Sequence, residues 1–165
     1  MKAAEMLDME IHLFDQFDSD FADMHRWVRE NGQEFTGIDW EGSHELAKVR
    51  TPEMNSCYHN TLLVRDYRDE SLLYYEGWCD FGIGVPMHHA WNVRDGVVLD
   101  VTLTLPNWED KRDTNNISYF GGEVPYDWAW EQVPHKGMRR PAMSSGPFMY
   151  DWASMKHTEQ QEVEA

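Results

Sequence analysis

A chain of 165 residues is long enough for one domain with a hydrophobic core, and its 8 Trp, 7 Tyr and 7 Phe exclude a disordered acidic segment. The formal net charge of −16 argues against direct binding to nucleic-acid phosphates, which requires lysine and arginine. No apolar run approaches the ~20 residues that a membrane-spanning helix needs. We expect one domain over residues 1–150 and an acidic C-terminal tail over residues 151–165.

The first predicted element is a helix over residues 5–30. Its apolar residues recur every three or four positions and form one buried stripe; they are Ile11, Phe14, Phe17, Phe21, Met24, Trp27 and Val28. A break is expected near residues 18–20, and "ENG" at 30–32 is a typical helix end. Residues 32–52 indicate a loop with short structured pieces.

A second helix is predicted to open within "TPEMNSCYHNTLLVRDY", which begins at Thr51. Asn55 or Ser56 can cap it, because short polar side chains accept hydrogen bonds from the free N–H groups of a first helical turn. Cys57 is therefore expected in the first turn of this helix.

An antiparallel sheet is predicted downstream, with strands at 71–79, 87–93 and 97–105. Asp95-Gly96 between apolar runs is a strong signal for a two-residue hairpin turn. Further along, residues 118–122 indicate a strand or turn and residues 125–133 a short helix. The fold class is thus α+β: a helix bearing Cys57 packs on an antiparallel sheet, and the N-terminal helix covers another part of the core.

The register of this hairpin distinguishes the two adjacent histidines. With Asp95-Gly96 as the turn, the numbers of opposing residues sum to 191, so Trp91 lies across from Asp100. His89 shares a face with Trp91 by alternation, which makes His89 and Asp100 diagonal neighbours on one face. His88 is expected to point to the opposite face.

The combination of Cys57, His89 and Asp100 predicts thiol chemistry. A cysteine nucleophile reacts as the thiolate, which a helix N-terminus favours, and it needs a neighbouring base with an orienting group. Cys57 alone resembles a buried apolar residue, and His89 or Asp100 alone resembles an ordinary structural residue. Together and in this order they favour a Cys-His-Asp triad.

These residues resemble the transglutaminase-like branch of the papain-like cysteine enzymes. The likeness covers residues 52–105 and lies in Cys57 at a helix start, "HAW" at 89–91 and "DVT" at 100–102. "YYEGW" at 74–78 and "YFGGEVP" at 119–125 are similar to motifs of small uncharacterised proteins of this kind, many of them encoded by phages.

The resemblance implies a cysteine-dependent hydrolase or acyltransferase that acts on an amide, peptide, ester or thioester carbonyl. Cys57 would be the nucleophile, His89 the general base and acid, and Asp100 the orienting group. Tyr58 stands where larger relatives commonly have a Trp. Candidates for substrate binding or oxyanion stabilisation are Asn55, Tyr58, Asn60 and Trp91.

No cofactor and no metal is expected. The two cysteines, Cys57 and Cys79, form neither a disulfide framework nor a C-x-x-C pair, and adjacent strand histidines face opposite ways. The N-terminal residues carry acids where a signal peptide needs an apolar core, so we expect a cytoplasmic protein with free thiols.

The charge favours an alternative function from another class. A non-enzymatic acidic protein could inhibit a host protein that binds nucleic acid, either as a nucleic-acid mimic or through a basic surface of its partner. The expected partners are therefore a protein or small-molecule acyl substrate for the enzyme, or a basic protein for the inhibitor. Neither membrane binding nor direct binding of nucleic acid is expected.

Overall fold

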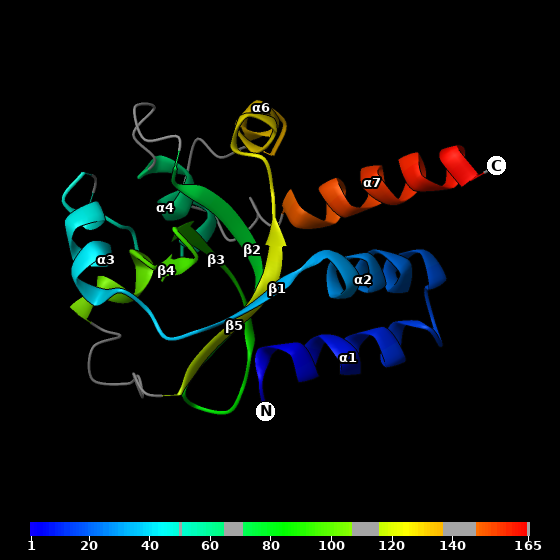
Figure 1. Cartoon of the computed structure of the whole chain (residues 1–165), viewed down its shortest axis with the longest axis horizontal. Coiled ribbons are helices and arrows are strands. Elements are labelled where there is room, and N and C mark those ends of the chain that lie inside the picture. The colour runs from blue at the N-terminus through cyan, green and yellow to red at the C-terminus, as the bar shows by residue number, and fades with distance from the viewer. Residues whose placement is uncertain (50, 65–70, 107–115, 137–147, 165) are drawn as a thin grey trace.

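The computed structural model describes residues 1–49, 51–64, 71–106, 116–136 and 148–164 (Figure 1). The helices are α1 (Ala3–Phe14), α2 (Ser19–Asn31), α3 (Trp40–Ala47), α4 (Cys57–Leu63), α6 (Tyr126–Lys136), α7 (Phe148–Glu164) and the 3-10 helix η1 (Thr102–Thr104). The strands are β1 (Gln33–Thr36), β2 (Leu73–Phe81), β3 (Met87–Arg94), β4 (Val97–Leu99) and β5 (Ile117–Glu123).

The strands form one antiparallel sheet in the order β1-β5-β2-β3-β4. The sheet curls, so that the segment after β1 reaches the opposite edge, where the backbone N–H of Asp39 donates to the carbonyl of Val98 at 2.9 Å. Helices and an antiparallel sheet in one chain confirm the predicted α+β class.

One face of the sheet is covered by α1, α2 and α7, which lie side by side in Figure 1. Tyr74 and Trp78 of β2 point to this face by strand alternation and pack with Leu7, Val28 and Phe148 from the three helices. These side chains are almost fully excluded from water, so burial of their apolar surface holds the helices to the sheet.

The other face of the sheet is dominated by aromatic rings. Tyr75 and Cys79 of β2, Trp91 of β3 and Tyr119 of β5 share this face and belong to one buried cluster. The rings of Trp91 and Tyr119 lie 5.0 Å apart between centroids. His89 and Asp100 contact this cluster, because the His89 ring stacks on Trp91 and Asp100 accepts a hydrogen bond from the Tyr119 hydroxyl.

The predicted break in the N-terminal helix is confirmed between α1 and α2. Asp18 caps α2 by accepting a hydrogen bond from the backbone N–H of Phe21 at 3.1 Å. Gly32 ends α2, as the "ENG" signal indicates. The break turns the chain, so that α1 and α2 pack against each other as a pair instead of one long helix.

One predicted segment agrees with the structure in outline and another differs from it. Residues 32–52 hold a strand and a helix, β1 and α3, because Phe35 pairs into the sheet and Asp39 caps α3 through Gly42. The predicted strand 97–105 ends at Leu99. Beyond it, the Asp100 carboxylate accepts from the backbone N–H groups of Thr102 and Leu103, and this bonding replaces the ladder with a 3-10 turn.

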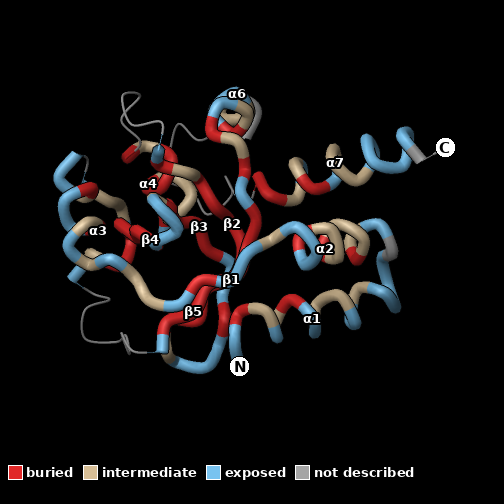
Figure 2. The backbone as a smooth tube through the Cα atoms, viewed as in Figure 1, coloured by how far each residue is buried: buried red, intermediate tan, exposed pale blue. Residues whose placement is uncertain are grey.

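Helix α7 runs through the boundary near residue 150 that the sequence suggests between domain and tail. Its first half is anchored, since Phe148, Met149 and Ala153 are buried, and its second half is exposed (Figure 2). None of the helices described combines the length and apolar character that a membrane crossing requires.

Candidate active site

The hairpin at the centre of the site has the predicted register. Arg94 pairs with Val97 and Asn92 with Leu99, so opposing residue numbers sum to 191. His89 Nε2 lies 2.6 Å from Asp100 Oδ2, which brings together the two side chains that this register predicts as neighbours. The prediction placed Asp100 on the second strand of the hairpin, but Asp100 lies just beyond the end of β4 at Leu99.

The Asp100 carboxylate is fully buried and held from several sides. Its Oδ1 accepts from the two backbone N–H groups that open η1, at 3.1 and 3.3 Å. Its Oδ2 accepts from His89 and from the Tyr119 hydroxyl, the latter at 3.1 Å. The Asp100 backbone N–H donates to Ser43 Oγ at 2.9 Å. A buried carboxylate with this many donors is fixed in orientation.

Helix α4 carries Cys57 to His89 and docks on the part of the β3 edge that does not pair with β4. Because β4 pairs only with residues 92–94, the Ala90 carbonyl is left for another donor, and the Thr61 hydroxyl of α4 fills that place at 3.0 Å. Asn92 Nδ2 donates to the Thr61 carbonyl at 3.3 Å. These bonds dock α4 on the strand edge, with Cys57 as its first residue.

The charge state of His89 follows from its two neighbours. Burial alone would lower the pKa of His89, but the charges of Asp100 and Cys57, together with a side-chain hydrogen bond to each, raise it to about 10. His89 is therefore an imidazolium at neutral pH. Since Nε2 is bonded to Asp100, Nδ1 is the nitrogen that faces the thiol.

The loop before Cys57 is clamped by Asn60. The Asn60 amide accepts from the Glu53 backbone N–H and donates to the Glu53 carbonyl, both at 2.8 Å. Its remaining N–H donates to Thr102 Oγ1 at 3.1 Å. Both donors of the amide are thus used, which corrects the expectation that Asn60 stabilises an oxyanion and gives it the role of tying the thiol loop to η1.

The N-terminus of α4 is left open beside the thiol. Ser56 occupies the N-cap position, but its hydroxyl donates to the Met54 carbonyl at 3.1 Å and does not cap the helix. The N–H groups of a first helical turn have no carbonyl partner within the helix. Asn55 is exposed and has a positive φ of 57°, a conformation that asparagine tolerates better than most residues. Asn55 therefore remains a candidate donor.

Trp91 and Tyr58 support the site from within. Trp91 is 0% exposed and its ring stacks on His89 at 6.5 Å between centroids, so it cannot contact substrate, contrary to its candidacy as a binding residue. A Cβ on Gly121 would clash with the Glu76 carbonyl oxygen and lie 2.7 Å from the Trp91 ring, so glycine is required at this position. Tyr58 is half-buried, and burial, then the charges of Glu76 and Cys57, raise its pKa.

Sequence reasoning missed Ser43 and Tyr119. Both contact Asp100, one from α3 and one from β5, at separations of 57 and 19 residues. Only the pairing of distant strands and the docking of α3 bring them to the carboxylate. No local sequence signal identifies such contacts, although "YFGG" marks the strand that carries Tyr119.

His88 points away from the site, as alternation predicts. It lies on the face covered by α1 and α7, with its Nε2 3.8 Å from Glu10 Oε1 and 3.3 Å from the Tyr150 hydroxyl. Within the described ranges, no three histidine, cysteine, aspartate or glutamate side chains are grouped to hold a metal ion.

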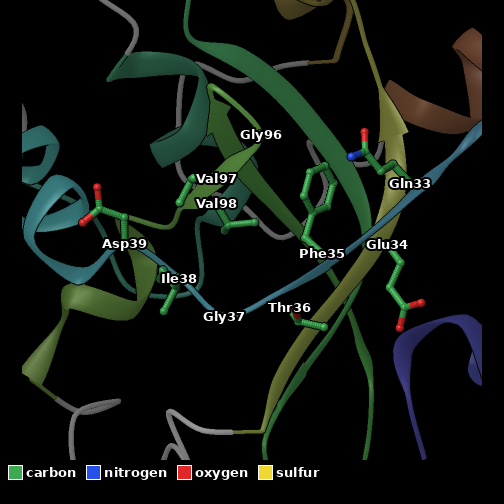
Figure 3. Close-up of a pocket in the computed structure, with 10 residues that line it drawn as sticks. All are labelled: Gln33, Glu34, Phe35, Thr36, Gly37, Ile38, Asp39, Gly96, Val97 and Val98. Carbon is green, nitrogen blue, oxygen red and sulfur yellow. The ribbon is translucent and has the colours of Figure 1, made fainter.

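A separate pocket of about 450 Å³ lies where the curled sheet brings β1 toward β4 (Figure 3). Residues 33–39 line one side and residues 96–98 the other. None of the candidate residues Cys57, His89 and Asp100 lines it. A ligand in this pocket would therefore contact the two sheet edges and not the thiol.

The chain matches no protein-family model, and no similar curated protein or solved structure is found.

Proposed function

We propose that this protein is a cysteine-dependent acyl-transfer or hydrolytic enzyme with a Cys57-His89-Asp100 triad. The observation that carries the proposal is the position of His89, which hydrogen-bonds the Cys57 side chain and the buried Asp100 carboxylate. This is the arrangement that an activated thiol requires: a base within reach of the nucleophile and a third group that orients the base.

The chemistry follows from the charge state of the pair. In the resting pair the proton of the Cys57 thiol resides on His89, so a thiolate lies beside an imidazolium. The thiolate attacks the carbonyl carbon, a C–S bond forms, and the imidazolium delivers its proton to the leaving group as the bond to that group breaks. His89 then removes a proton from water or an amine, which attacks the acyl-enzyme and releases Cys57.

Stabilisation of the oxyanion is the second requirement. The open first turn of α4 offers the Cys57 backbone N–H, and the exposed Asn55 amide is the nearest side-chain candidate in the sequence. Donors of this kind stabilise the tetrahedral intermediate where its negative charge develops. We expect Asn55 to contribute and Asn60 to act only by holding the loop.

The fold supports assignment to the transglutaminase-like branch of papain-like enzymes. A helix that begins with the cysteine, a strand with His89 and then Asp100 occur in the same chain order as in that group, although Asp100 lies in a turn here and the resemblance places it on the next strand. The "HAW" and "DVT" motifs occupy these positions. We propose this kinship on the order of these residues along the chain and on the two motifs.

The test is the pH dependence of Cys57 alkylation by iodoacetamide, followed at the Cys57 peptide by mass spectrometry. Wild-type protein should react readily below pH 7, because the imidazolium stabilises the thiolate. In His89→Ala, the rate at pH 6 should fall on the order of tenfold or more and should rise only near pH ~8.5, as for an ordinary thiol. His88→Ala is the matched control and should behave as wild type.

An ordinary thiol profile in all three proteins would refute the triad. A second assay then tests acylation: p-nitrophenyl acetate should place one acetyl group on Cys57, visible by intact mass, and Cys57→Ala should take up none there. If Cys57 is inert and the protein binds a basic protein tightly and in a salt-sensitive way, the acidic binding function explains the charge of −16 better.

A further inference from the structure

The hydrogen-bond network of the site extends beyond the three proposed catalytic residues, to Tyr119 on β5. The Tyr119 hydroxyl donates to Asp100 Oδ2, the same oxygen that accepts from His89. On its other side the Tyr119 hydroxyl is hydrogen-bonded to the Cys79 thiol. His89, Tyr119, Asp100 and Cys79 are all buried, so the bonds among them are shielded from competing water.

We infer that Tyr119 is a positioning residue that regulates the proposed thiol site by sharing Asp100 Oδ2 with His89. The inference rests on the proposed function and goes beyond it, because it names the group that decides how strongly His89 holds its proton. A donor on the shared oxygen withdraws negative charge from the carboxylate. Asp100 therefore attracts the imidazolium less than an unshared carboxylate would.

The geometry distinguishes an effect of Tyr119 on the charge of Asp100 from a role of Tyr119 in packing alone. Oδ1 of Asp100 is held by the backbone N–H groups of Thr102 and Leu103, so the carboxylate keeps its orientation without Tyr119. Burial, then the charge of Asp100, raises the pKa of Tyr119 well above its ordinary value, so the phenol remains a donor. Removal of the hydroxyl would thus take one donor from Oδ2 and the hydrogen bond from Cys79, while the carboxylate keeps its orientation.

The charged and titratable groups that face this network come from several elements. Cys57 of α4 faces His89, Asp100 follows β4, and Cys79 and Asp80 belong to β2. Any shift in the titration of His89 has to be read against these groups. A background without Cys57 removes the group most strongly coupled to His89 after Asp100.

The experiment compares Cys57→Ala with Cys57→Ala/Tyr119→Phe by the NMR titration of the His89 ring. Loss of the hydroxyl should raise the midpoint by about half a unit to one unit, about half of what a hydrogen bond to a charged group is worth, because the bond to Asp100 is present in both charge states of His89 and only its strength differs between them. Tyr126→Phe in the same background is the control. Its hydroxyl is buried but donates to the Leu62 carbonyl at 2.9 Å, so the midpoint should not move.

An unchanged or lowered midpoint in a folded Tyr119→Phe protein would overturn the inference. If that variant does not fold, the Cζ resonance of Tyr119 in Cys57→Ala alone provides the test. It should follow the His89 titration with the same midpoint, whereas that of Tyr126 should not, and a Tyr119 resonance that ignores the titration would also overturn the inference. Both measurements use proteins without the Cys57 thiol, so a negative result in either is distinct from a negative result in the alkylation test.

Discussion

His89 and Asp100 form a buried pair, with 2.6 Å between Nε2 and Oδ2 and side-chain exposures of 5% and 0%. A charge pair in this setting persists only if its remaining hydrogen-bonding groups are satisfied, and both oxygens of Asp100 are. The other residues of the site are therefore arranged around this pair: Tyr119 donates to Asp100, and Cys57 is hydrogen-bonded to His89.

Asp100→Asn should lower the pKa of His89 from about 10 toward its ordinary value of about 6.5. Burial opposes the imidazolium, and the Asp100 charge is the largest effect that favours it. NMR titration of the His89 ring measures the change. Asp95→Asn, an exposed substitution in the turn of the same hairpin, is the control and should leave the titration unaltered. A pKa that stays near 10 in Asp100→Asn would contradict the ion pair.

Cys57→Ala should also lower the pKa of His89, but by less than Asp100→Asn does. The thiolate charge and its hydrogen bond both favour the imidazolium, and the Cys57 charge is the weaker of the two charge effects. The same titration measures this change. Met54→Ala, at an exposed position in the loop before Cys57, should have no effect. Equal titration of His89 with and without Cys57 would show that the thiol does not pair with the ring.

The hairpin could be predicted because its determinants are local. Asp95-Gly96 adopts positive φ angles of 52° and 78° and so sets the register of β3 against β4, which separates His88 from His89. The α4 start at Cys57 and the break before α2 are likewise set by residues within a few positions. The hairpin accounts for His89 and Asp100 as neighbours, and the helix start accounts for the position of Cys57.

The rest depends on contacts between distant segments. The end of β4 could not be read from the alternating "VVLDVTLTL", because the Asp100 carboxylate competes for the backbone N–H groups of the next turn. Ser43 and Tyr119 reach Asp100 only once α3 docks and β5 inserts between β1 and β2. The burial of Trp91, which removes it from any substrate surface, is another consequence of this packing.

The contribution of His89 to stability should disappear at high pH. A group whose pKa is raised from about 6.5 in the unfolded chain to about 10 in the fold stabilises fully below pH ~6.5, and this stabilisation is lost as the pH rises to about 10. Urea denaturation at pH 6, 8 and 10 should show the free energies of wild type and His89→Gln converging as the pH rises. Exposed His44→Gln on α3 should track wild type throughout. A constant difference between wild type and His89→Gln would rule out the raised pKa.

Glu10 should stabilise the fold with the opposite pH dependence. Burial raises its pKa, but hydrogen bonds with His25 and His88 outweigh this and lower the pKa to about 2. A depressed pKa gives stability that is present above pH ~4.5 and is lost as the pH falls to about 2. Glu10→Gln should cost about 2 kcal/mol at pH 6, where charged hydrogen bonds are lost, and much less near pH 2.

Acid denaturation followed by circular dichroism measures the Glu10 effect. The control is Glu30→Gln, an exposed position near the end of α2, which should change stability little at either pH. A Glu10→Gln penalty that is the same at pH 2 and pH 6 would mean that the carboxylate charge does not contribute.

Glu76→Gln should loosen the attachment of α7 to the sheet. The buried Glu76 carboxylate accepts from the backbone N–H groups of Phe148 and Met149, at 3.1 and 2.8 Å, and from the Tyr74 hydroxyl. An amide in its place presents an N–H group to donors and loses the charge that favours a helix N-terminus, so we expect a loss of about 3 kcal/mol. Urea denaturation measures this, and faster amide hydrogen exchange at Met149 locates it. Glu123→Gln, exposed on β5, is the matched control. A loss no larger than that of the control would show that apolar packing alone anchors α7.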